Sequence, residues 1–291
     1  MKIAMLGSLG NINRVAIPEL IAAGHEVTVM TSSAERVAGI AELGAHAVVG
    51  DITDLDSLVA TLTGADVAYL MLTGRANGSL VAHGEKVGQL FKNALQKTGV
   101  TRVVNLSSVG ADQGPEIGAL YVYNIIERML ASLPIDITFI RPVAFYGNLM
   151  STIQTIKNQQ AIINNFPASH RNAYVWPADI AATVVDAILH PVAGKTVRYV
   201  VSDMFTGDEL VTALRETLDL PELKWVEISD EQALANMTAA GMPEAVATEF
   251  VKLGASQRSE TAYTDLLTHL PEFSAFKLAD FMPIYKAAYE R

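Results

Sequence analysis

Short apolar runs alternate with amphipathic stretches along the first half of the chain. Runs that predict buried strands lie before Gly7 and at residues 27–30, 45–49, 67–72, 102–106 and 135–140. Apolar positions with helical spacing cover residues 34–43, 55–62, 80–98 and 119–133. This β-α-β-α order predicts a parallel sheet with right-handed crossovers. We therefore expect an α/β protein with a doubly wound, Rossmann-like sheet.

The alternation changes after Arg141-Pro142. Helical spacing begins at Ser151, a second helix is expected from Pro177, and residues 196–201 predict one further strand that rejoins the sheet. Residues 206–291 predict several helices and contain a short apolar run at 223–228. We expect a dinucleotide-binding core at 1–150, to which 173–203 return. Residues 151–172 and 204–291 are expected to form a smaller, mostly helical lobe that covers the substrate.

The first strand is followed by two glycines and a helical pattern. Gly7 permits a tight turn and Gly10 lets the backbone approach a pyrophosphate, while the N-terminus of the helix attracts an anion. Asn13 stands where a third glycine is usual, so a looser or shifted contact between helix and strand is expected. The predicted phosphate-binding residues are Gly7, Ser8, Leu9, Gly10, Asn11 and Ile12.

The ends of the other strands supply the remaining candidate residues, because ligands of doubly wound sheets bind outside the carboxyl ends of the strands. The second strand ends at Thr31-Ser32-Ser33 without the acid that holds the ribose of NAD, and Arg36 follows. The hydroxyls and Arg36 suit the 2′-phosphate of NADP, which favours NADP as the cofactor. Alternatively, Arg36 is a solvated helix residue, and NAD is the alternative cofactor. Asp51 suits an adenine amine or the cap of the next helix. The other predicted cofactor-binding residues are Ile52, Leu72, Thr73, Gly74, Arg75, Ser107, Ser108, Glu127, Pro142 and Val143.

Tyr123 and Ser107 are the candidate catalytic residues. Tyr123 and Glu127 are four positions apart and share one helix face. Carbonyl reductases commonly pair such a tyrosine with a lysine that lowers its pKa, whereas a carboxylate raises the pKa of a phenol. Tyr123 is therefore a weak general acid by this route, and a packing role is the alternative.

Composition narrows the class of protein. The 291 residues include 21 basic and 31 acidic residues, a net charge of -10 that disfavours a nucleic-acid partner. The chain contains no cysteine and no apolar run of bilayer length. We expect a cytoplasmic protein with no metal site and no membrane partner, acting on a small molecule; a homodimer is compatible with the apolar composition.

The chain resembles the NmrA-like, atypical short-chain dehydrogenase/reductase proteins over nearly its whole length. The resemblance rests on Gly7-Ser8-Leu9-Gly10-Asn11-Ile12, Gly24-His25-Glu26-Val27, Gly44-Ala45, Gly50-Asp51, Gly64-Ala65-Asp66, Tyr123-x-x-x-Glu127, Arg141-Pro142 and Pro177-Ala178-Asp179-Ile180-Ala181. It implies NAD(P) binding, usually NADP. Some members reduce quinones or dyes, whereas others bind the dinucleotide to report redox state to a partner protein. Asn13 and the absence of an arginine directly after the second strand depart from the family pattern.

Two functions follow from these residues. The first is an NAD(P)H-dependent oxidoreductase that transfers hydride to a small quinone-like or carbonyl acceptor, with Phe145, Tyr146 and Trp176 as candidate walls of the acceptor pocket. The second is a dinucleotide sensor without catalysis that regulates a protein partner.

Overall fold

A parallel sheet lies at the centre of the protein. The computed structural model describes residues 1–74, 78–259 and 263–291. Within them, seven strands form this sheet in the order β10-β6-β5-β4-β1-β2-β3, and every neighbouring pair is parallel. The strands are β1 (Lys2–Met5), β2 (Glu26–Thr31), β3 (His46–Val49), β4 (Val67–Met71), β5 (Arg102–Leu106), β6 (Asp136–Pro142) and β10 (Lys195–Val200). The doubly wound α/β fold is thus confirmed, and β10 rejoins the sheet as predicted.

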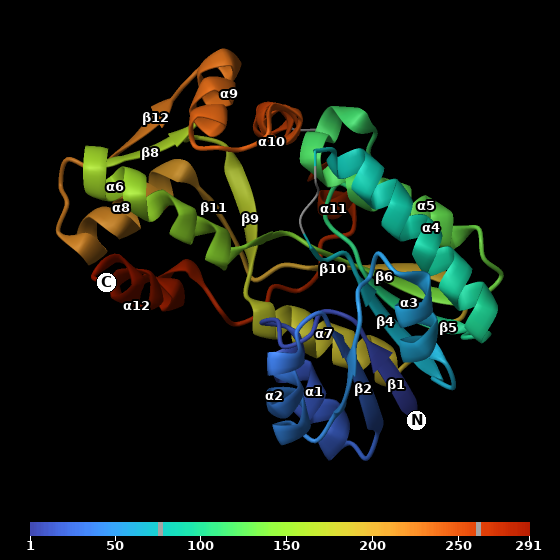
Figure 1. Ribbon diagram of the computed structural model, residues 1–291. Helices are drawn as coiled ribbons and strands as arrows, with labels where there is room; N and C mark the ends of the chain where they lie inside the picture. Colours follow the sequence, from blue (N-terminus) through green and yellow to red (C-terminus); the bar gives the residue numbers. More distant parts are fainter. Residues whose placement is uncertain (75–77, 260–262) are drawn as a thin grey trace.

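Helices cover both faces of this sheet (Figure 1). One face packs on α1 (Asn13–Ala22), α2 (Val37–Glu42) and α7 (Pro177–Leu189). The other packs on α3 (Leu55–Leu62), α4 (Leu80–Thr98) and α5 (Tyr121–Ala131). Apolar side chains from sheet and helices form one buried cluster on each face, which explains the near-continuous apolar strands.

Two predicted helix caps are present. The Asp54 carboxylate accepts a hydrogen bond from the Ser57 amide at 2.9 Å, and the Ser79 hydroxyl accepts one from the Ala82 amide at 3.2 Å. These bonds satisfy first-turn amides that have no partner within their helix. The predicted helix 34–43 begins with the short 3-10 turn η1 (Ala34–Arg36) before α2. Of the helices in the described residues, none combines the length and apolar character that a bilayer crossing requires.

The second lobe is built around its own apolar cluster. Tyr146, Phe281 and Tyr285 are fully buried in it, and the rings of Tyr146 and Phe281 are 5.0 Å apart. The lobe also contains two small sheets that the sequence did not predict, β11-β9-β7 and β12-β8. Its elements are β7 (Ala144–Phe145), η3 (Tyr146–Thr152), α6 (Ile153–Gln159), β8 (Ala161–Asn164), β9 (Arg171–Val175), β11 (Asp203–Thr206), α8 (Gly207–Leu218), β12 (Lys224–Glu227), α9 (Asp230–Ala239), α10 (Glu244–Ser256) and α12 (Leu278–Tyr289). The short helix α11 (Thr264–Thr268) packs on the core through Leu266.

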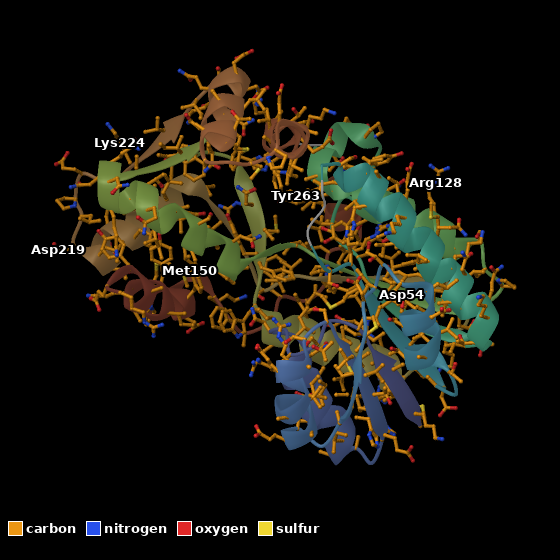
Figure 2. All side chains as sticks on the ribbon, in the orientation of Figure 1. Asp54, Arg128, Met150, Asp219, Lys224 and Tyr263 are labelled. Atoms are coloured by element: carbon orange, nitrogen blue, oxygen red, sulfur yellow. The ribbon has the colours of Figure 1, made fainter. Side chains whose placement is uncertain are left out.

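Helix α10 connects this lobe to the core. It packs on η2 (Pro115–Leu120), where Gly118 has φ +65° and a Cβ atom would lie 2.2 Å from the Glu249 carbonyl oxygen. On the lobe side, the Asn165 amide donates to the Val251 carbonyl at 3.0 Å. Figure 2 shows Asp219 and Lys224 in the lobe and Asp54 and Arg128 on the core. Only glycine allows this approach of η2 to α10, so the position of the helix is tightly constrained.

Candidate functional site

The turn after β1 requires glycine at its first position. Gly7 has φ +100°, and a Cβ atom there would lie 2.2 Å from the Met71 sulfur. The Ser8 hydroxyl donates to the Thr31 hydroxyl at 2.8 Å, which ties the turn to the end of β2. Within residues 1–74, helix α1 begins without a side-chain cap and without an acidic residue in its first turn. The amides of Arg14 and Val15 donate to the carbonyls of Gly10 and Ile12. Among the described residues, the amides of residues 11–13 make no such bond and are available to an anion, as the pyrophosphate of a dinucleotide requires.

Asn13 fills the place of the third glycine. Its side chain is buried, and its Nδ2 donates to the carbonyls of Leu6 and Ser8, both at 2.9 Å. The Oδ1 atom is buried and has no hydrogen-bond partner among the described residues. The asparagine thus links the start of α1 to both ends of the turn, a contact that the glycine of the usual pattern cannot make.

A cavity of about 370 Å³ opens beside this turn and is called the turn cavity here. Eight of the predicted residues line it: Gly7, Ser8, Ser32, Arg36, Asp51, Ile52, Thr73 and Gly74. Sequence reasoning missed His83, whose Nε2 lies 3.3 Å from the Thr73 carbonyl oxygen. Hydrogen bonds from the Thr53 amide and hydroxyl lower the pKa of Asp51, so this carboxylate is ionised.

The other predicted cofactor residues of this region do not line the turn cavity or lie outside the described residues. Thr31 is buried beneath it, and Ser33 donates its amide hydrogen to the Thr31 hydroxyl at 3.3 Å. Leu9, Gly10, Asn11, Ile12 and Leu72 do not line the cavity. Arg75 lies outside the described residues.

A second cavity, of about 510 Å³, lies between the core and the lobe and is called the interlobe cavity. Ser108 and Val143 line it where β5 and β6 end, and Tyr123 lines it from α5. Phe145 also lines it, whereas Tyr146 and Trp176 belong to the cluster inside the lobe; Trp176 stacks on Phe276 with ring centroids 4.4 Å apart. Within the described part of the chain, the lining contains no aspartate, glutamate, lysine, arginine or histidine. The cavity therefore suits an uncharged, partly aromatic ligand.

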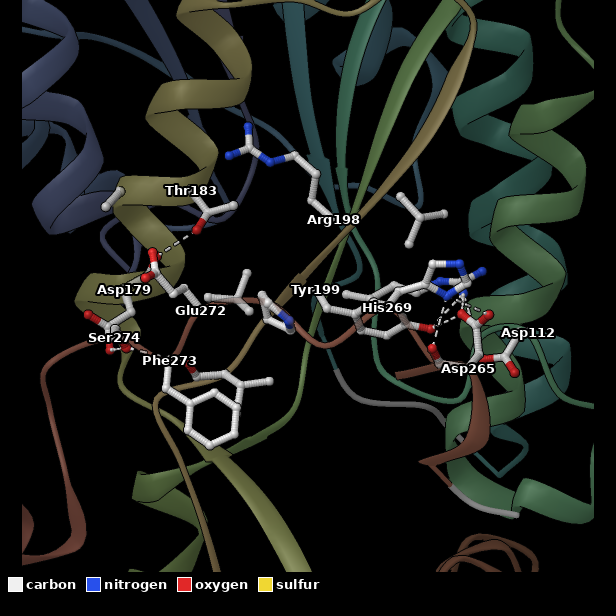
Figure 3. Close-up of a pocket in the computed structure, with 16 residues that line it drawn as sticks. Asp112, Asp179, Thr183, Arg198, Tyr199, Asp265, His269, Glu272, Phe273 and Ser274 are labelled. Atoms are coloured by element: carbon white, nitrogen blue, oxygen red, sulfur yellow. Dashed lines mark hydrogen bonds and ion pairs between the residues drawn. The ribbon is translucent and has the colours of Figure 1, made fainter. Parts of the chain in front are cut away.

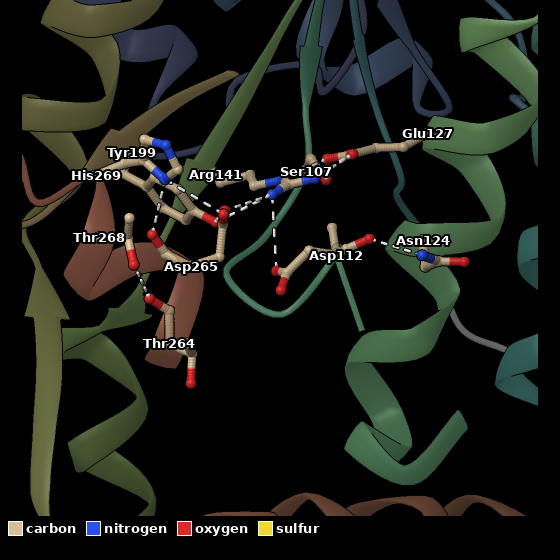
Figure 4. Close-up of polar contacts among 11 residues, drawn as sticks. Ser107, Asp112, Asn124, Glu127, Arg141, Tyr199, Thr264, Asp265, Thr268 and His269 are labelled. Carbon is tan, nitrogen blue, oxygen red and sulfur yellow. Dashed lines mark hydrogen bonds and ion pairs between the residues drawn. The ribbon is translucent and has the colours of Figure 1, made fainter. Parts of the chain in front are cut away.

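Glu127 of α5 and Arg141 of β6 form a buried ion pair (Figure 4). The Arg141 guanidinium donates to both carboxylate oxygens of Glu127, at 3.0 and 2.7 Å. The Ser107 hydroxyl also donates to Glu127, at 2.5 Å. Burial by itself would lower the pKa of Arg141, but the hydrogen bonds and charge of Glu127 outweigh it, and the pKa is raised. Glu127 therefore neutralises an arginine and orients Ser107.

These contacts bear on the two candidate catalytic residues. Ser107 is buried and does not line the interlobe cavity, since its hydroxyl faces α5. Pro142 and Glu127 also do not line this cavity. Burial raises the pKa of Tyr123, so its phenol remains protonated at neutral pH. Of the two, Tyr123 is the one that can present a hydrogen-bond donor to a ligand in the cavity.

A third cavity, of about 1050 Å³, lies against the outer edge of the sheet between β10, α7 and the segment 265–274 (Figure 3). Arg141 belongs to its lining, and its Nη1 donates to Asp265 at 3.2 Å and to the Tyr199 hydroxyl at 3.0 Å. Tyr199 in turn donates to Asp265. The buried ion pair of the core is thus connected to α11, whose Leu266 is buried in the apolar cluster on the α1 and α7 face of the sheet.

Comparison with known proteins places these features in a family. A family model described as NAD(P)H-binding matches residues 7–191. The chain is 28% identical over 218 residues to the photosystem II assembly factor Ycf39 of Synechocystis sp.. The matched region covers 72% of this chain and 66% of that protein, just under two thirds of its length. It is 24% identical to the NAD(P)H azoreductase of Xenophilus azovorans over 84% of this chain and 83% of that protein.

Solved structures show the same fold over nearly the whole chain. The NADPH-dependent quinone oxidoreductase QOR2 of Escherichia coli, in complex with NADPH, matches with a TM-score of 0.79 and 19% identity, covering 98% of this chain and 99% of that one. The triphenylmethane reductase of Citrobacter sp., in complex with NADP(H), matches with a TM-score of 0.77 and 17% identity, covering 98% and 100%. Because the family model spans more than half of the sequence, the chain belongs to the NAD(P)H-binding family, as its resemblance to the NmrA-like proteins implies.

Proposed function

We propose that the protein is an NADPH-dependent reductase of small, uncharged, quinone-like acceptors. The observation that carries this proposal is the uncharged, aromatic interlobe cavity against the ends of β5 and β6, in a chain whose turn after β1 fits a pyrophosphate. The azoreductase relative and the quinone oxidoreductase and dye reductase folds agree with it.

The turn cavity supports NADP over NAD. Arg36 and the Ser32 hydroxyl lie in one lining beside the end of β2, where a 2′-phosphate would be bound. Asp51 shares this lining, but one of its oxygens already accepts both hydrogen bonds from Thr53. We expect Arg36→Ala to weaken NADPH binding by roughly tenfold or more, because the variant loses a charge-assisted hydrogen bond to the 2′-phosphate. NADH binding should be unchanged, because NADH has no such phosphate. Calorimetric titration of both dinucleotides measures this difference.

The chain itself would supply binding, orientation and exclusion of water. NADPH, when bound, supplies the hydride. Val109, Val143 and Phe145 would hold a flat acceptor against the strand ends, and the protonated Tyr123 phenol would donate a hydrogen bond to an acceptor oxygen. A quinone accepts hydride without a strongly tuned acid, so the absence of a lysine four residues after Tyr123 is compatible with this reaction.

The test is NADPH oxidation by purified protein with a panel of neutral quinones, followed by nicotinamide absorbance. We expect faster turnover with NADPH than with NADH. Tyr123→Phe should lower the turnover without abolishing it. NADPH that binds in calorimetry but is not oxidised above the protein-free rate with any quinone would refute the reductase.

One observation favours a second candidate function, a dinucleotide sensor. The position expected for a catalytic lysine carries Glu127, and its ion pair with Arg141 extends to Asp265 on α11. A ligand that shifted this pair would move α11 and the half-exposed Asp265 side chain. A sensor must bind NADPH and NADP⁺ with different affinities, because a ligand with equal affinity for both states shifts nothing. Equal affinities in calorimetry would exclude it.

A further inference from the structure

We propose that Asn172 and Gln257 select the acceptor by hydrogen-bonding its polar edge. The inference rests on the proposed reductase function and specifies its substrate: an uncharged aromatic quinone with an N–H or O–H donor beside a carbonyl. Both amides line the interlobe cavity, Asn172 from β9 and Gln257 from the turn after α10.

Gln257 presents to this cavity an amide that is only partly hydrogen-bonded. The residue is 8% exposed, and its side chain interacts with the ring of His170, a contact that opposes the fall in the pKa of His170 caused by burial. The Nε2 of Gln257 makes one long bond, 3.4 Å to the Ser256 hydroxyl. A buried amide N–H group without a good acceptor is unfavourable, since it has lost its hydrogen bond to water. A carbonyl oxygen of a ligand in the cavity would accept a hydrogen bond from this group.

Asn172 brings a second amide into the same lining. It is also 8% exposed, and no hydrogen bond within the described residues engages its side chain. Two residues further along β9, Tyr174 lines the cavity from the same face of the strand. Its ring stacks on Phe205 with centroids 4.4 Å apart, which fixes this wall. The amide of Asn172 is therefore held at the cavity surface by a rigid strand.

The two amides specify a kind of ligand. A primary amide offers both a donor and an acceptor, and it pairs best with a ligand edge that carries the complementary two groups. The lining within the described residues offers no charge to balance a sulfonate, a carboxylate or an ammonium group. A neutral quinone with an amino group beside a carbonyl meets both conditions, whereas its methyl analogue has the same shape and leaves the amides unpaired.

The experiment compares these two acceptors in three variants. Asn172→Leu and Gln257→Met replace each amide by an apolar side chain of similar size, and Leu253→Met alters the same cavity without touching an amide. We expect each amide variant to lower kcat/KM for the aminonaphthoquinone roughly tenfold and for the methylnaphthoquinone by less than about threefold. Leu253→Met should change both acceptors alike, and naphthoquinone sulfonate should be a poor substrate of every form.

Equal losses of kcat/KM on both quinones would overturn the proposal, because they indicate that the amides shape the cavity and do not bind the polar edge. Unchanged kcat/KM values in the amide variants would overturn it as well. If the wild-type protein oxidises no NADPH with either quinone, the reductase function fails. Calorimetric binding of the aminonaphthoquinone to the protein with NADP⁺ then decides: a roughly tenfold weaker affinity in both amide variants, absent for the methyl analogue, supports the site, and equal affinities refute it.

Discussion

The buried pair of Glu127 and Arg141 permits a quantitative prediction of stability. The two side chains are 10% and 8% exposed, so Glu127→Leu leaves a buried guanidinium without its bidentate partner. Removing one member of such a pair costs about 3–5 kcal/mol. Asp265 at 3.2 Å and Asp112 at 3.7 Å remain near Arg141, which places the expected cost near the lower end, at about 3 kcal/mol.

This cost converts to a change in Tm. For 291 residues the entropy of unfolding is about 0.6 kcal/mol/K, so Glu127→Leu should lower Tm by about 5 °C. Replacing both charges, in Glu127→Leu/Arg141→Met, should recover about half of the loss or more, because apolar side chains of similar volume substitute well for a buried pair. Glu127→Lys should be less stable than Glu127→Leu, since it places a second cation beside Arg141.

Differential scanning calorimetry of the three variants, without dinucleotide, measures these changes. A Tm of Glu127→Leu within about 1 °C of the wild type would refute the reasoning, because the arginine would then not depend on its partner. A double variant less stable than Glu127→Leu would refute it as well, since the remaining cost would not be an unpaired charge.

Three further predictions concern other parts of the fold. Gly118→Ala should lower Tm more than Gly64→Ala. Both positions have a positive φ, which costs an alanine about 1–2 kcal/mol, but of the two only Gly118 would bring the new Cβ against backbone atoms. Burial lowers the pKa of His170 from 6.5, so the unfolded chain binds this proton more readily than the folded protein. The free energy of unfolding should therefore fall as the pH drops through about 6.5, and His170→Phe should remove this contribution to the pH dependence of the urea midpoint. Thr206→Ala breaks the capping box of α8 and should lower Tm by about 2 °C, whereas Thr212→Ala, within the same helix, should not.

Local patterns predicted the central sheet well because its inner strands β1, β4, β5 and β6 are almost entirely buried and helices separate the strands from β1 to β6 along the chain. Residues 55–62 and 80–98 form α3 and α4 with the predicted bounds. The pairing of β8 with β12 was not predictable in this way. Some 60 residues separate the two strands, and each is too short for its periodicity to indicate a partner.

The site was predictable only in part for a similar reason. The turn after β1 has a local glycine signature, and most of the turn cavity follows from the ends of consecutive strands. The partner of Glu127 depends on which face of β6 carries Arg141. The alternation Ile137, Phe139, Arg141 gives a signal for this, since it places a charge on a face that is otherwise apolar. Asn172 and Gln257 come from the lobe, and no sequence pattern brings those two positions together.

The place of β10 in the sheet has a consequence for synthesis on the ribosome. Strand β6 ends at Pro142, but its partner on the outer side, β10, begins only at Lys195. At about 5–20 residues per second, the emerging chain presents an open, apolar strand edge for several seconds before that partner arrives. Such an edge can pair with a neighbouring chain. Expression at a lower temperature or with chaperones should therefore raise the yield of monodisperse protein more than changes to its surface charge.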